Sequence, residues 1–108
     1  MKKIIYVENT SHPDICASLN NLGTSCSDLG DHKKAIRYHE QSLSMEKTIY
    51  GENAAHPDIA KSLNNLGTSS SHLGLKKEAI RYFEQSIKIM KLIYGEEKRV
   101  GLNYPLLS

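Results

Sequence analysis

The eight residues Ser18–Ser25, with the sequence SLNNLGTS, occur a second time, unchanged, as Ser62–Ser69. The match extends in both directions at a fixed offset of about 44 residues, which lies in the range of solenoid repeats. His-Pro-Asp-Ile recurs upstream, and Ala-Ile-Arg-Tyr, Glu-Gln-Ser and Ile-Tyr-Gly-Glu recur downstream. About two thirds of the residues are identical when 9–52 is aligned with 53–96. The sequence therefore predicts two copies of one structural unit, repeat 1 (9–52) and repeat 2 (53–96).

Each repeat has the pattern of two helices. In the first half of repeat 1, apolar residues are spaced by four, three, four and three, which is typical of one face of an α-helix. In the second half they cover more than one face, as expected of a helix with two neighbours. Pro13 and Pro57 suit the first helical position, with His12 or Ser11 as the cap before Pro13. We expect an all-α fold with helices near 14–29, 33–50, 58–73 and 77–94, closed by Gly30, Gly51 and Gly95.

The two ends of the chain depart from this unit. Met1–Tyr6 aligns with Met45–Tyr50, so residues 1–8 are predicted to be the end of a preceding repeat helix. Residues 97–108 do not restart the His-Pro-Asp pattern and are predicted to be a non-repeat tail. This organisation indicates a fragment or the edge of a longer array.

Gly23 and its copy Gly67 lie inside predicted helices, where glycine costs about 1 kcal/mol against alanine. We therefore expect a second helix to cross closely at each, with Ala35 facing Gly23 and Ala79 facing Gly67. Asn21 and Asn65 lie beside the apolar stripe and are expected to make structural hydrogen bonds, because polar groups between helices need partners.

Composition excludes several classes of protein. The net charge is +2, with basic and acidic residues interleaved, which argues against a nucleic-acid-binding surface. No apolar run approaches the roughly 20 residues of a membrane helix, so membrane insertion is not expected. The N-terminus lacks an apolar stretch of signal-peptide length. A cytoplasmic protein is the expectation.

No pattern of catalytic or metal-binding residues emerges. Cys16 and Cys26 would lie about 15 Å apart on one helix, beyond disulfide reach, and small residues replace both in repeat 2. The five histidines lack the spacing of a zinc site. His-Pro-Asp also occurs in the J-domain of chaperone partners, but once and in a loop, whereas here it starts a helix twice. We expect no cofactor, no metal and no catalysis.

Leu19, Leu22, Gly23 and Ala35, which all recur in repeat 2, resemble the tetratricopeptide repeat. Phe83 matches the aromatic residue of the family's second helix, and the departures are His39, Ser42, Ser86, Cys26 and Ser70. The long period is similar to the long-helix variety found in kinesin light chains and nephrocystin-type proteins. The resemblance implies a right-handed α-solenoid of antiparallel helix hairpins, whose first helices line a concave groove for peptides.

The resemblance also implies which residues would contact a peptide. They lie on the side of each first helix that faces away from the leucines, and their amides and hydroxyls suit a peptide backbone. The predicted groove residues are Asn20, Thr24, Asp28, Lys61, Asn64, Thr68 and His72. An ordinary solvated helix surface is the alternative interpretation.

The leading functional hypothesis is a non-catalytic scaffold or adaptor module that binds an extended peptide or a partner protein. The first alternative is a structural spacer, or a segment that self-associates through exposed repeat ends. The second is a regulatory part of a larger multidomain enzyme. Because Asn20 and Asn64 are identical, as are Thr24 and Thr68, the sequence does not separate these alternatives.

Overall fold

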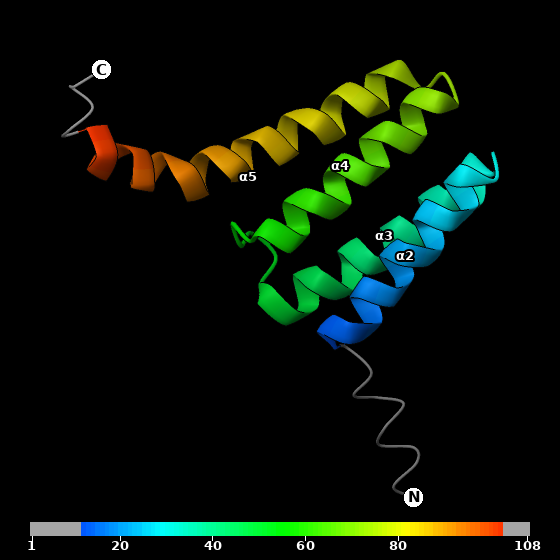
Figure 1. Cartoon of the computed structure of the whole chain (residues 1–108), viewed down its shortest axis with the longest axis horizontal. Coiled ribbons are helices and arrows are strands. Elements are labelled where there is room, and N and C mark those ends of the chain that lie inside the picture. The colour runs from blue at the N-terminus through cyan, green and yellow to red at the C-terminus, as the bar shows by residue number, and fades with distance from the viewer. Residues whose placement is uncertain (1–11, 103–108) are drawn as a thin grey trace, which may run out of the picture.

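The computed structural model describes residues 12–102, which form four helices in chain order. They are α2 (Pro13–Asp28), α3 (His32–Tyr50), α4 (Pro57–His72) and α5 (Lys76–Leu102). Each helix packs against the one before it, and the chain reverses direction at every connection (Figure 1). The described residues contain no strand, so the all-α prediction is confirmed. The first three helices agree with the predicted bounds to within one residue.

Two parts of the predicted organisation remain predictions. The helix end predicted within residues 1–8 lies outside the described residues. The right-handed sense of the helix stack also stays a prediction.

The His-Pro-Asp tripeptide starts both α2 and α4. The imidazole Nδ1 of His12 accepts a hydrogen bond from the backbone N–H of Asp14, and His56 does the same for Asp58, each at 3.0 Å. The proline comes next, at the first helical position, where its missing N–H has no partner to lose. The tripeptide is therefore a capping device, with the histidine as the cap residue.

α5 is longer than predicted. The prediction ended it near residue 94 with Gly95 closing it, but the helix continues to Leu102. The equivalent Gly51 does end α3, with a φ of 117° that favours glycine. The two glycines differ in the residues after them, because Pro57 comes soon after Gly51, whereas Gly95 precedes the helix-favouring run Glu96–Arg99. Residues 97–102 of the predicted non-repeat tail therefore continue α5, and the division of the chain at residue 97 stays a prediction.

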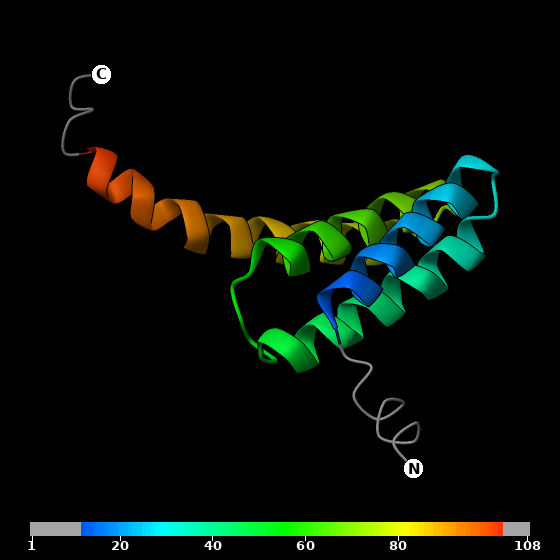
Figure 2. The same cartoon turned by 60° about the horizontal axis from the view of Figure 1, so that its bottom comes forward.

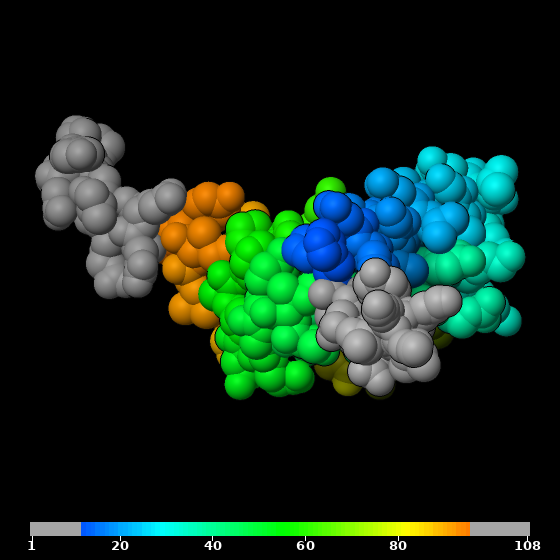
Figure 3. Space-filling model, turned by 90° about the horizontal axis from the view of Figure 1, so that it is seen from below, coloured from blue at the N-terminus to red at the C-terminus, as the bar shows by residue number. Residues whose placement is uncertain are grey.

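The core is concentrated on α4, which lies between α3 and α5 in Figure 1 and in front of α5 in Figure 2. Ile59, Leu63 and Leu66 are each at most 2% exposed. Burying one such side chain contributes about 1.5–3 kcal/mol relative to leaving it exposed. On α2, which among the described helices packs mainly on α3, Leu22 is 47% exposed although it is the copy of Leu66. The blue atoms of α2 accordingly remain visible at the surface in Figure 3.

Candidate functional site

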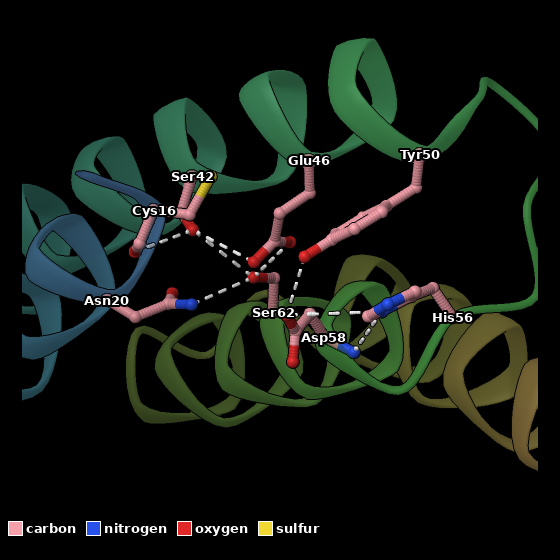
Figure 4. Close-up of polar contacts among 8 residues, drawn as sticks. All are labelled: Cys16, Asn20, Ser42, Glu46, Tyr50, His56, Asp58 and Ser62. Atoms are coloured by element: carbon pink, nitrogen blue, oxygen red, sulfur yellow. Dashed lines mark hydrogen bonds and ion pairs between the residues drawn. The ribbon is translucent and has the colours of Figure 1, made fainter. Parts of the chain in front are cut away.

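A cluster of buried polar side chains joins α2, α3 and α4 (Figure 4). Ser62 of α4 lies at its centre. The Ser62 hydroxyl accepts a hydrogen bond from Nδ2 of Asn20 on α2 at 3.0 Å and donates one to Oε1 of Glu46 on α3 at 2.7 Å. We call Asn20, Ser42, Glu46 and Ser62 the Ser62 cluster; each of the four is at most 7% exposed. This cluster connects repeat 2 to both helices of repeat 1.

Two serine hydroxyls bond to the Glu46 carboxyl group, one from α3 and one from α4. The Ser42 hydroxyl donates its single proton to the carbonyl oxygen of Cys16, at 3.0 Å. Oε2 of Glu46 is a second, more distant acceptor for the same hydroxyl, at 3.3 Å. Burial raises the pKa of Glu46, and the neighbouring Asp58 carboxylate adds to the rise. The side chain therefore connects two serines by accepting a hydrogen bond from each.

His39 of α3 completes the buried polar network. Its Nδ1 lies 2.8 Å from Oδ1 of Asn20, and because that oxygen can only accept, Nδ1 carries the proton. Burial lowers the pKa of His39, which keeps the ring neutral. The ring lies directly over Gly23, where an added Cβ would come within 2.6 Å of it.

The close approach predicted at the two helical glycines is present, but its partner was wrong. Gly23 faces the His39 ring and Gly67 faces the Phe83 ring, rather than Ala35 and Ala79. The larger side chain one turn along the second helix fills the space that the missing Cβ leaves.

A second set of contacts fixes the end of α3 against the start of α4. The Tyr50 hydroxyl donates a hydrogen bond to Oδ2 of Asp58 at 3.0 Å. The Tyr50 ring also stacks on His56, with ring centroids 3.6 Å apart and an interplanar angle of 10°. The residues that start α4 thus also position it on repeat 1.

The structure divides the predicted groove residues. Asn20 is buried and both ends of its amide are hydrogen-bonded within the protein, so the expectation that it lies free on the groove wall is wrong. Asn21, expected to make a structural hydrogen bond, is instead exposed. The roles that the sequence suggested for Asn20 and Asn21 are therefore exchanged. The buried face of α2 contains Asn20, one residue after Leu19, rather than Asn21. The remaining predicted residues are exposed: Thr24, Asp28, Lys61, Asn64, Thr68 and His72.

Four of these exposed residues border one hollow between the C-terminal halves of α2 and α4. Its volume is about 280 Å³, and Thr24, Asp28, Thr68 and His72 line it. The Thr68 hydroxyl donates to the backbone oxygen of Asn64 at 3.1 Å, and Nδ1 of His72 donates to the backbone oxygen of Thr68 at 2.8 Å. His72 also stacks on a neighbour, His32 of α3, at 4.5 Å between ring centroids. These local contacts hold the hollow's side chains in place.

A larger hollow of about 740 Å³ lies between α4 and the C-terminal half of α5. The side chains that line it include Ala60, Asn64, Ile87, Met90 and Tyr94. Ile87 and Tyr94 are 54% and 47% exposed, so part of this apolar surface is open to solvent. The sequence did not indicate a groove at this place.

The Ser62 cluster was also missed. Ser42 and Ser86 stood out where the resemblance implied alanine, and that departure was the available signal. Nothing in the sequence marked Glu46 as buried, because Met90 occupies its position in repeat 2.

The described part of the chain offers no group of three or more histidine, cysteine or acidic side chains placed to hold a metal. Cys16 is buried, Cys26 is half-buried, and neither is in a disulfide. Burial raises the pKa of the Cys16 thiol, which makes it a poor nucleophile.

Between residues 12 and 102, none of the helices combines the length and apolar character that crossing a membrane requires. A family model described as tetratricopeptide repeat matches the chain twice, over residues 5–48 and 14–92. A comparison with curated proteins finds no match.

Proposed function

Because the chain belongs to the tetratricopeptide repeat family, whose repeats generally mediate protein–protein interaction, we propose that it is a non-catalytic module that binds an extended segment of a partner protein. The proposed site is the exposed surface shared by the first helices of the two repeats, here called the α2/α4 face. Its residues are Thr24, Asp28, Lys61, Asn64, Thr68 and His72.

The observation that carries this proposal is the pair Thr24 and Thr68. They occupy the same position in the two repeats and border the same hollow from opposite helices, α2 and α4. The buried Ser62 cluster holds these two helices in a fixed relation without using either threonine. A surface that is organised before binding loses less entropy when a ligand docks.

The α2/α4 face has hydrogen-bond acceptors at one end and donors at the other. The protons of Thr68 and of His72 Nδ1 are used within α4, so the threonine oxygen and the other imidazole nitrogen are acceptors for a ligand. The Asp28 carboxylate adds a further acceptor at the same end. Lys61 and the Asn64 amide offer donors at the other end. We therefore expect a ligand with an acidic side chain near Lys61 and donor groups near Asp28.

The test is a selection of linear peptides from a random phage-displayed library on the full chain. Thr24→Arg with Thr68→Arg fills the hollow, and we expect it to weaken the selected peptides at least tenfold, about 1.4 kcal/mol. Arg81→Glu on the exposed side of α5 is the control and should leave binding unchanged. Peptides that tolerate the double arginine change but are lost with Arg81→Glu would place the site on the opposite surface and overturn the proposal.

A second candidate, a segment that self-associates, is favoured by a separate observation. Apolar side chains are exposed at both ends of the helix stack, with Leu22 on α2 and Ile87 on α5 each about half exposed.

A further inference from the structure

Six side chains on one face of α2 have identical copies on α4 but different surroundings. On α4, Ile59, Ser62, Leu63, Leu66 and Ser69 are buried and Leu73 is half-buried. On α2 the equivalent side chains are all half-buried or exposed, and Leu29 is 86% exposed. We call this surface of α2 the docking face: Ile15, Ser18, Leu19, Leu22, Ser25 and Leu29.

The α4 copy of this face packs mainly on α3. Polar side chains at the start of α4 enter a groove between α2 and α3, here called the inner groove. Asn20 and Cys16 form its α2 wall, and Ser42, Glu46 and Tyr50 form its α3 wall. Ser62 enters this groove and bonds to Asn20 and Glu46, and Asp58 bonds to Tyr50 at its end.

Repeat 2 builds the same groove at the other end of the stack. The outer groove consists of Ala60, Asn64, Ser86, Met90 and Tyr94, the copies of the five inner-groove residues. Its wall is constructed in the same way, since Ser86 donates to the backbone oxygen of Ala60 at 2.9 Å as Ser42 does to Cys16 at 3.0 Å. It is open, with a volume of about 740 Å³, and in Figure 3 the orange atoms of α5 extend beyond the green atoms of the α3–α4 segment.

We propose that the chain associates head to tail, with the docking face of one copy seated in the outer groove of another. The occupant is a second copy because the docking face has the same six residues as the α4 surface that packs on α3 and places Ser62 in the inner groove. The two complementary surfaces lie at opposite ends of the stack, so one molecule cannot join them to each other (Figure 1). Such a contact is heterologous and leaves a free docking face and a free groove after every addition.

The polar pairs of the internal junction are available at this intermolecular one. The Ser18 hydroxyl of one copy accepts a hydrogen bond from the Asn64 amide of the other, as the Ser62 hydroxyl accepts one from Asn20. Asp14 accepts from the Tyr94 hydroxyl, as Asp58 does from Tyr50, and His12 stacks on the Tyr94 ring as His56 does on Tyr50. All three pairs have the same residue types at the two junctions.

One position distinguishes the two junctions. Met90 replaces Glu46, so the outer groove has no carboxyl group for the incoming serine. Ser18 keeps Asn64 and Ser86 as partners, which match Asn20 and Ser42 of the inner groove. The intermolecular junction is therefore more apolar than the internal one, which suits association between folded molecules.

The test is sedimentation of the full chain over a concentration series, with one variant at each end. Leu22→Asp disables the docking face and Ile87→Asp disables the outer groove; both side chains are about half exposed, so the fold should survive, which circular dichroism checks. We expect the unmodified chain to form assemblies that grow with concentration and each variant alone to be monomeric. Leu92→Asp changes an equally exposed side chain of α5 outside the groove and should assemble normally.

Mixing the two variants is the decisive step. Leu22→Asp keeps its groove and Ile87→Asp keeps its docking face, so an equimolar mixture should form dimers that grow no further. An unmodified chain that stays monomeric throughout the series would overturn the proposal, because it would mean that something other than a second copy covers the groove. Assemblies that survive both single changes, or a mixture that stays monomeric, would equally contradict it.

Discussion

Asn20 and Asn64 occupy the same position in two repeats, yet Asn20 is 7% exposed and hydrogen-bonded to Ser62, whereas Asn64 is exposed. The difference arises from the next helix. α4 covers Asn20, and the described chain places no helix over Asn64. One side chain in one sequence context is thus a buried structural connector in repeat 1 and a surface group in repeat 2.

This contrast predicts different costs for the same substitution. Asn20→Ala leaves the buried His39 Nδ1–H without an acceptor and removes the donor to the Ser62 oxygen, so it should lower the free energy of unfolding by about 1–3 kcal/mol. Asn64→Ala removes a surface amide and should change stability by no more than about 0.5 kcal/mol. Urea unfolding of both variants, at a concentration where the chain is monomeric, measures the difference. Equal costs would contradict the assignment of Asn20 to the buried cluster.

The raised pKa of Glu46 implies that the free energy of unfolding falls as the pH rises. Burial raises its pKa in the folded state above the ordinary value of 4.5, so the folded protein favours the protonated form. The stability that the protonated Glu46 carboxyl group contributes is therefore complete below pH 4.5. It is lost as the pH rises through the folded-state pKa. Glu46→Gln keeps the shape and remains neutral, so the stability difference between variant and unmodified chain should grow with pH across this window. A difference that stays constant would show that Glu46 titrates normally.

The lowered pKa of His39 implies that the free energy of unfolding falls as the pH falls. Burial lowers its pKa below the ordinary value of 6.5, so stability is lost as the pH falls from 6.5 towards the folded-state pKa. His39→Phe introduces the residue that repeat 2 has at this position. The variant loses a hydrogen bond to Asn20, but its stability relative to the unmodified chain should improve as the pH falls below 6.5. Unfolding curves at several pH values test this; a parallel decline of both proteins would contradict it.

Two helical glycines offer a matched comparison. A Cβ at Gly67 would lie 2.7 Å from the Phe83 ring, whereas a Cβ at Gly95 meets nothing within 4 Å. Gly67→Ala should therefore overpack the crossing and cost about 1–3 kcal/mol. Gly95→Ala should stabilise α5 by about 0.5–1 kcal/mol, because alanine is the better helix former. Thermal unfolding ranks the two, and a stabilising Gly67→Ala would mean that the helices cross elsewhere.

The repeat and its helices could be predicted from the sequence because apolar spacing and the Pro and Gly positions are local signals. The burial of Asn20 could not, since Asn64 is identical and only the packing of α4 separates them. Glu46 was missed because nothing local marks an acidic residue as buried. The end of α5 was misplaced because Ile-Tyr-Gly-Glu ends α3 only together with the connector after Gly51.

The predicted groove residues were only partly correct for the same reason. The helical spacing identified the exposed side of α4 correctly, so Lys61, Asn64, Thr68 and His72 are accessible. Asn20 was placed with them because the sequence does not show where α4 lies across α2. Binding of a peptide by the accessible residues stays a prediction.

The central claim is that the inner and outer grooves are equivalent, and that residues 12–102 of one molecule fill the inner groove alone. Thiol labelling of Met90→Cys tests it most directly, in a background where Cys16→Ala and Cys26→Ser introduce the residues of repeat 2. Leu92→Cys in the same background is the control, because that side chain lies on α5 outside the groove. We predict that the thiol at position 90 reacts rapidly in dilute solution and progressively more slowly as the concentration rises, while the thiol at 92 does not change. A position-90 thiol that is protected in dilute solution, or whose reaction rate is independent of concentration, would contradict the account.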